Sequence, residues 1–295
     1  GNTLPYLQSV TYRTFTDGTV EFTNLETDNI DVADGVDPND VPQVKSNPSL
    51  VYKQIPSLSF GGIELNVTAK PLDNIHVRQA IAWGVNREEQ LQVISKNIGV
   101  VAQGPIPPGS WAFNNSFAPY HYDVNQAKAA LQQAGLTSVS FTLKTVSGSA
   151  LATQQAQIIQ SELQPAGINV TIQEETFATL LSDTQTHNFQ AAILGWSGRI
   201  DPDGNMYSWF HTGGGNNDML YSNPQVDQLL DQARTTSDQP TRIKDYQQAE
   251  MQIVSDASYV FINHGVSIQA SSTKVQNFTL LPTGMMEFAN VFLNA

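Results

Sequence analysis

The chain has 295 residues, of which 40% are hydrophobic and 14% charged, a composition that supports a folded core and argues against disorder. Its formal net charge of −13 disfavours binding to nucleic acid and to anionic membrane surfaces. The sequence contains no cysteine, which excludes disulfide bonds and thiolate metal sites. No apolar run approaches the roughly 18 residues that a membrane-spanning helix needs.

Residues 1–56 predict strands with one helix between them. Val10–Phe15 alternates β-branched and aromatic residues with others, which indicates a strand. Val20–Asp28 is predicted to be a short helix, and Ile30–Ala33 a second strand. The segment is too short to form a domain by itself, so we expect it to be part of a larger unit.

The following 80 residues or so are expected to contain one strand, three helices and a proline-rich loop. A strand is predicted at Ile63–Val67, followed by helices at Asn74–Gly84 and Arg87–Asn97. Gly104–Trp111 contains three prolines in four residues, and we predict a stiff loop that ends in a tryptophan. Asp123–Ala134 is a helix with an aspartate cap and a glycine after its last residue.

The second half of the chain alternates strands and helices, which indicates an α/β sheet with right-handed crossovers. The predicted strands lie near residues 139–143, 168–172 and 190–195, with helices over 152–163 and 177–181 between them. Two more helices, 223–233 and 241–256, precede late strands at 259–262 and 266–270.

The stretch after the third of these strands is the best candidate for a functional site. Ala191–Leu194 is a short apolar run that breaks at Gly195 into a loop with Trp196, Ser197 and Arg199. Ligands of open α/β sheets bind outside the carboxyl ends of the strands, and this loop carries an indole, a hydroxyl and a guanidinium group there. The alternative is a surface turn that contains a tryptophan.

Arg199 carries the most specific chemistry in this loop, since the chain has only 14 lysines and arginines. A guanidinium group pairs in a bidentate way with a carboxylate or phosphate of a ligand. The alternative is a salt bridge to Asp201 or Asp203 in the same loop.

Enzymatic and metal sites are less favoured by the residues. Gly195–Arg199 approaches the G-x-S-x-G elbow of serine hydrolases, but its last position is arginine where that turn needs glycine. A hydrolase that uses Ser197 remains the alternative function, and it requires a histidine within hydrogen-bond reach. A third possibility is an interaction module without a ligand cleft.

Metal and cofactor sites are not expected either. The five histidines lack metal-ligand spacing, so we expect no metal and no cofactor. Asp201–Asn205 lacks the later ligands of a calcium loop, and we interpret it as an Asp-Pro turn with Gly204 at positive φ.

Several blocks in order resemble the solute-binding proteins of peptide, dipeptide and nickel ABC importers, known as family 5. The blocks are Ile63–Asn66 with Lys70–Ile81, Gly104–Trp111, Tyr122–Lys128, Trp196–Asn205 and Asn223–Arg234. The resemblance implies an α/β fold of the periplasmic-binding-protein-like type II, or flytrap, class, with a mixed sheet flanked by helices. It implies that residues 57–270 form the second lobe, and that residues 1–56 and 271–295 are parts of a first lobe whose N-terminal portion is missing.

The resemblance also implies a function and a set of site residues. The function is an extracytoplasmic binding component, monomeric and not an enzyme, that captures a peptide or similar small polar or anionic ligand for ABC permease subunits. Its location is periplasmic or extracellular, with a membrane anchor if the protein is a lipoprotein. Peptide-binding members often carry an aspartate for the peptide ammonium where this chain has Arg199, which favours an anionic group instead. The expected ligand-binding residues are Gly195, Trp196, Ser197, Gly198, Arg199, Asp201 (to orient Arg199) and Trp111.

Overall fold

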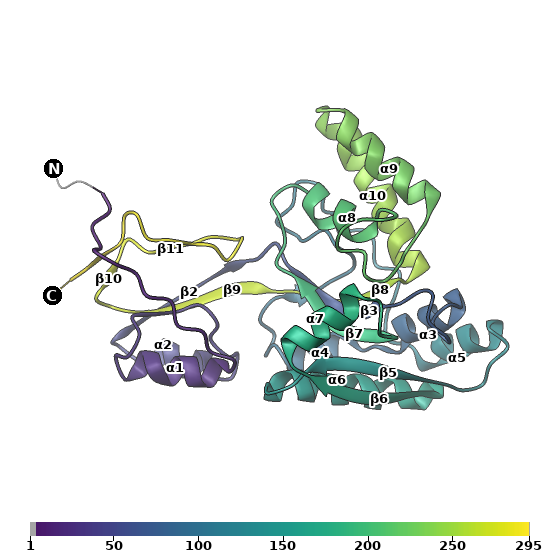
Figure 1. The fold of residues 1–295 in the computed structure, drawn as a ribbon, viewed down its shortest axis with the longest axis horizontal. Coiled ribbons are helices and arrows are strands. Elements are labelled where there is room, and N and C mark those ends of the chain that lie inside the picture. Colours follow the sequence, from purple (N-terminus) through teal and green to yellow (C-terminus); the bar gives the residue numbers. More distant parts are fainter. Residues whose placement is uncertain (1–3, 295) are drawn as a thin grey trace. The chain divides into compact units, whose positions relative to one another are not determined.

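The computed structural model describes residues 4–294 and divides them into two compact units (Figure 1). The terminal unit comprises the residues up to Ser57 and those from Val266 onward, and the central unit is Leu58–Gly265. Residues 266–270, which we expected in the second lobe, belong to a strand that pairs within the terminal unit. The interpretation of the two units as lobes remains a prediction.

Among its described residues, the terminal unit contains two helices and a three-stranded antiparallel sheet with the order β1-β9-β2. Its elements are α1 (Gly18–Glu26), α2 (Val41–Ser46), β1 (Val32–Ala33), β2 (Leu50–Pro56) and β9 (Val266–Ser272). Two short ribbons pair β10 (Val275–Gln276) with β13 (Phe292–Leu293), and β11 (Thr279–Leu280) with β12 (Met286–Glu287).

The predicted helix near residue 20 is confirmed, whereas the strand at Val10–Phe15 is wrong. Asp17 starts α1, because its carboxylate accepts hydrogen bonds from the backbone of Thr19 and Val20. Val10–Phe15 is assigned to no strand in the described structure, and the Tyr12 side chain is 67% exposed. The alternating pattern was present, but a strand also needs a neighbouring strand to take its backbone hydrogen bonds.

The central unit is built on a six-stranded mixed sheet with the order β4-β8-β3-β7-β5-β6 (Figure 1). Its strands are β3 (Phe60–Leu65), β4 (Val100–Val101), β5 (Val139–Val146), β6 (Ile168–Glu175), β7 (Ala191–Trp196) and β8 (Tyr259–His264). β5 runs parallel to β6 and β7, and the other pairs are antiparallel. The mixed α/β architecture agrees with the expected fold class.

Helices flank this sheet, and several begin at a residue whose side chain caps the helix. They are α3 (Ile75–Gly84), α4 (Arg87–Val93), α5 (Val124–Gln133), α6 (Ala150–Leu163), a 3₁₀ turn (Gln164–Ala166), α7 (Phe177–Gln185), α8 (Asp203–Phe210), α9 (Pro224–Thr235) and α10 (Gln239–Asp256). Asn74, Asp123 and Asn223 each accept a hydrogen bond from a backbone N–H of the helix that follows. Within residues 4–294, no helix combines the length and apolar character needed to cross a membrane.

Helix α8 occupies part of the stretch that we predicted to be a loop. Asp201 Oδ1 accepts a hydrogen bond from the Asp203 backbone at 3.0 Å, and the helix begins there. The Gly204 N–H donates to the Asp201 carbonyl at 3.0 Å, so the Asp-Pro turn is present, but Gly204 lies in the helix and the expected positive φ is wrong. A Cβ atom at Gly204 would lie 2.5 Å from Arg199 Cβ, so glycine is required because the loop packs closely on the helix.

An aromatic cluster joins this helix to the sheet. Phe60 of β3 is buried and contacts Trp209 of α8 and Tyr259 of β8, each with a ring-centroid distance of 5.4 Å. The ring centre of Trp196, at the end of β7, lies 5.6 Å from that of Trp209. The loop after β7 is therefore anchored at both ends on the central core.

Candidate functional site

Strands β5 and β7 separate from each other at their carboxyl ends. Their ladder consists of two residue pairs, Leu143 with Ala191 and Lys144 with Ala192. Beyond these pairs, β5 continues beside β6 and β7 continues beside β3 to the ends of both strands. Parallel strands that diverge in this way open a crevice at their carboxyl ends, where α/β proteins bind ligands.

A cavity of about 290 Å³ lies in this opening. Its lining comes from β3, β5, β7, β8, α6 and α7, and consists of Gly61, Gly62, Thr145, Val146, Ala152, Gln155, Phe177, Leu180, Ile193, Leu194, Gly195 and Asn263. Gly195 is the sequence-predicted site residue that the cavity includes. The cavity is therefore continuous with the strand end that precedes the Trp196 loop.

Trp196 is held by its own loop. Its Nε1 donates a hydrogen bond to the carbonyl of Gly204 at 3.0 Å, and the side chain is half-buried against the core. The indole therefore has a fixed position and forms a platform on which another group can stack.

Arg199 lies on this platform, with its guanidinium carbon 4.2 Å from the Trp196 ring centre. Nη1 donates to Ser197 Oγ at 3.2 Å and to the Gly198 carbonyl at 2.7 Å, and the backbone N–H donates to Asn205 Oδ1 at 2.7 Å. Within the described residues, Nε and Nη2 have no hydrogen-bond partner. Because Arg199 is exposed, a positioned guanidinium edge faces solvent.

The acidic residues of the loop bind other arginines. Asp201 Oδ1 accepts a hydrogen bond from Arg242 Nη2 at 2.7 Å, and Asp203 receives two bonds of 2.7 Å from Arg234. The predicted role of Asp201 in orienting Arg199 is therefore wrong, and so is the alternative salt bridge of Arg199. Both arginines come from helices α9 and α10, which only the tertiary structure brings to this loop.

Trp111 reaches the loop indirectly. Its ring lies 6.1 Å from that of Tyr246, and the Arg242 guanidinium lies 5.0 Å from the Trp111 ring centre. Since Arg242 also binds Asp201, Trp111 supports the far side of the loop. It is not among the residues that line the 290 Å³ cavity.

The geometry around Ser197 does not support a hydrolase. Its hydroxyl accepts a hydrogen bond from Arg199, and no histidine among residues 4–294 is bonded to it. His187, His211 and His264 each form a ring-nitrogen contact with a backbone carbonyl elsewhere. The described part of the chain also contains no group of three or more acidic, histidine or cysteine side chains able to hold a metal.

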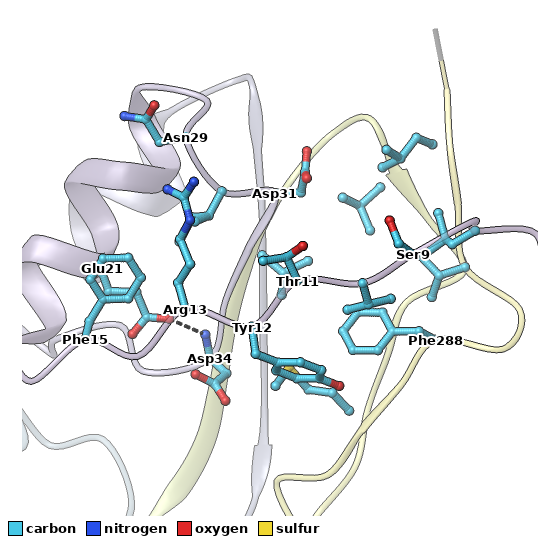
Figure 2. Close-up of a pocket in the computed structure, with 18 residues that line it drawn as sticks. Ser9, Thr11, Tyr12, Arg13, Phe15, Glu21, Asn29, Asp31, Asp34 and Phe288 are labelled. Carbon is cyan, nitrogen blue, oxygen red and sulfur yellow. Dashed lines mark hydrogen bonds between the residues drawn. The ribbon is translucent and has the colours of Figure 1, made fainter.

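A second cavity, of about 340 Å³, lies in the terminal unit (Figure 2). The unpaired segment around Tyr12 and Arg13 forms one wall, and Phe288 lies on another. Glu21 Oε1 accepts a hydrogen bond from the Asp34 backbone at 2.9 Å, and burial raises the pKa of the Glu21 carboxyl. None of the sequence-predicted site residues lines this cavity.

Several residues of the central cavity were missed from the sequence. They are Thr145, Gln155, Phe177, Leu180 and Asn263. The rule that pointed to the end of β7 also applies to the end of β5, and it would have identified Thr145. The others lie on helices and on a distant strand, and their spacing in the chain gives no signal of their proximity.

Comparisons with known proteins agree with this architecture. Residues 1–217 match the family described as "Bacterial extracellular solute-binding proteins, family 5 Middle". The dipeptide-binding protein of Escherichia coli is 27% identical over 298 residues, which cover 98% of this chain and 56% of that protein. The chain therefore spans about half the length of the curated relatives it matches.

Solved structures give the same result. The periplasmic binding protein DppA of Helicobacter pylori, in complex with the peptide STSA, is 28% identical with a TM-score of 0.89, covering 95% of this chain and 56% of that one. The dipeptide-binding protein of Pseudoalteromonas sp. SM9913, in complex with Met-Leu, is 27% identical with a TM-score of 0.85, covering 94% and 56%. The chain thus belongs to the bacterial extracellular solute-binding proteins of family 5.

Proposed function

We propose that this chain is part of the extracytoplasmic solute-binding component of an ABC importer and binds a peptide-like ligand with an anionic group. The observation that carries the proposal is the exposed guanidinium of Arg199, stacked on Trp196 beside the opening between β5 and β7. The relatives support the peptide class, since the Helicobacter and Pseudoalteromonas proteins were solved with a peptide and a dipeptide.

Arg199 provides the charge selection. Its Nη1 is occupied by the loop, which holds the guanidinium in place and leaves Nε and Nη2 for a ligand carboxylate. A pre-oriented guanidinium loses little conformational entropy when it pairs with a carboxylate. The same group repels a ligand ammonium, so the α-ammonium of a peptide is disfavoured at this point.

The end of β7 provides the backbone contacts. Beyond Ala192 this strand no longer pairs with β5, so its free edge can take an extended ligand by strand addition. Gly195 is exposed and lacks a side chain, which allows a ligand backbone to approach closely.

The proposed work is capture and delivery without covalent chemistry. The partners are the permease subunits of the importer, the binding component acts as a monomer, and its location is periplasmic or extracellular, with a membrane anchor if it is a lipoprotein. The relatives are named as binding proteins, and one as periplasmic, which supports this assignment.

Calorimetric titration with matched dipeptides tests the proposal. We expect N-acetyl dipeptides, which keep the carboxylate and lack the ammonium, to bind, and the corresponding free-amine dipeptide amides not to bind. Arg199→Gln should weaken binding of the acetylated forms at least about tenfold, because a charge-assisted hydrogen bond contributes about 1.5–3 kcal/mol. Lys128→Gln, which also removes one positive charge, lies at an exposed position of α5 outside both cavities; it is the matched control and should leave affinity unchanged. Tighter binding of the amides, or unchanged affinity in Arg199→Gln, would overturn the proposal.

A further inference from the structure

We infer that the cavity between β5 and β7 receives one uncharged, mainly apolar side chain of the ligand, selected by Phe177 and Gln155. The inference rests on the proposed function, because it assigns a ligand class to the same site. Arg199 selects the anionic group of the ligand, and the cavity selects an uncharged side chain of the same ligand.

The cavity is large enough for a ligand side chain. Its volume of about 290 Å³ lies near the lower limit of pockets that bind small molecules, roughly 300–1,000 Å³. Because Arg199 is not part of its lining, the anionic group of a dipeptide-like ligand binds outside the cavity, and we assign one side chain of the ligand to it.

The lining excludes charge. Among the described residues that form the wall, none is acidic, basic or histidine. The nearest buried cation in sequence, Lys144 of β5, is bound by the carboxylates of Glu175 and Asp183 and is unavailable to a ligand. A charged ligand side chain would lose its hydration in this cavity without gaining a counter-ion, which is strongly unfavourable.

The polar atoms of the wall can bind, at most, one uncharged hydrogen-bonding group at the end of the ligand side chain. Thr145 is fully buried, so its Oγ1 is out of reach of a ligand in the cavity. Gln155 is half-buried and contributes an amide from α6 on the wall of the cavity. This amide can bind a hydroxyl group, so a tyrosine-like side chain fits as well as an aliphatic one.

Phe177 forms the outer part of the wall. It is the first residue of α7, which Thr176 caps by accepting a hydrogen bond from the Thr179 backbone. The Phe177 side chain is 58% exposed, so a ligand side chain that packs on it removes apolar surface from water. The aromatic ring therefore favours apolar ligand groups without contributing to the protein core.

Four acetylated dipeptides that differ only in the first residue test the inference. Calorimetry on the full chain should show N-acetyl-Leu-Ala and N-acetyl-Tyr-Ala binding at least about tenfold more tightly than the Lys and Glu counterparts. Gln155→Glu adds a carboxylate to the wall and should shift the Lys-to-Leu affinity ratio at least about tenfold toward Lys. Phe177→Ala should weaken only the Leu and Tyr ligands.

Gln157→Glu is the matched control, because it makes the same charge change at an exposed position of α6 outside the cavity. It should leave the affinity ratios unchanged. Equal binding of all four ligands, with Gln155→Glu without effect and Arg199→Gln still impaired, would overturn the inference while the proposed function stands. Failure of all four ligands to bind would overturn both.

Discussion

The two cavities differ more in their walls than in their volumes. The central cavity lies between parallel strands of a six-stranded sheet and is neutral among the described lining residues. The terminal cavity is slightly larger, but part of its wall is an extended segment without a strand partner, and its lining includes Arg13, Glu21, Asp31 and Asp34. A cavity can select a ligand only where hydrogen bonds and packing hold its wall in place, so volume alone is a poor guide to function.

The largest expected effect comes from the ion pair beside the central cavity. Lys144 joins β5 to Glu175 at the end of β6 and to Asp183 of α7, and the Lys144 and Glu175 side chains are 8% and 9% exposed. Lys144→Met leaves two carboxylates without their cation, and we expect it to lose more stability in urea unfolding than the loss of an exposed lysine.

Lys53→Met provides the comparison from the terminal unit. Lys53 is exposed and donates to the Phe278 carbonyl at 2.5 Å. Its replacement should cost about 1 kcal/mol or less, because solvent screens an exposed charge. Equal losses of stability in Lys144→Met and Lys53→Met would contradict the expectation that the wall of the central cavity is held more firmly than the terminal unit.

A smaller effect is the pH dependence of stability, which should be stronger for a buried carboxyl of the central unit than for a half-buried carboxyl of the terminal unit. Glu64 of β3 is buried, neither of its carboxyl oxygens has a partner among the described residues, and burial, with a contribution from Asp218, raises its pKa to about 8. Between pH 4.5 and 8 the unfolded chain loses a proton that the folded chain keeps. Stability should therefore fall as pH rises through this window, by about 3 kcal/mol at pH 7 from this group.

Urea unfolding at pH 5 and pH 8 measures this dependence. Glu64→Gln removes the titrating group, and the difference in stability between the two pH values should shrink by an amount of that order. Glu21→Gln, in the terminal cavity, should change it less, because Glu21 is only half-buried and its carboxylate accepts a backbone hydrogen bond. A Glu64→Gln variant with the wild-type pH dependence would show that Glu64 ionises in the folded protein.

The smallest effect is expected at the wall of the terminal cavity. Tyr12 is 67% exposed there, and its ring meets Phe288 edge to face at 6.1 Å. Tyr12→Ala should change the free energy of unfolding by about 0.5 kcal/mol or less, as is usual for surface positions. A loss above about 2 kcal/mol would mean that the terminal wall is as well ordered as the central one.

Local sequence signals located most of the regular structure. Helix caps such as Asp123 and Asn223 act within three residues of themselves, so their helices begin where the sequence predicted. The strand at Ala191–Leu194 also follows from neighbouring residues alone, but the predicted break at Gly195 is wrong, because β7 continues to Trp196 in its pairing with β3. The family could be inferred from ordered blocks, and the expected fold class followed from it.

The tertiary structure decided which side chains meet. Arg242 forms a salt bridge with Asp201 and Arg234 forms one with Asp203, whereas Arg199 stacks on the ring of Trp196. The cavity exists because β5 and β7 separate after two residue pairs, a property of the whole sheet and not of either strand. Partners far apart in the chain leave no periodic pattern, so the sequence determined most of the helices and strands, whereas packing across the sheet determined the charge pairs and the cavity.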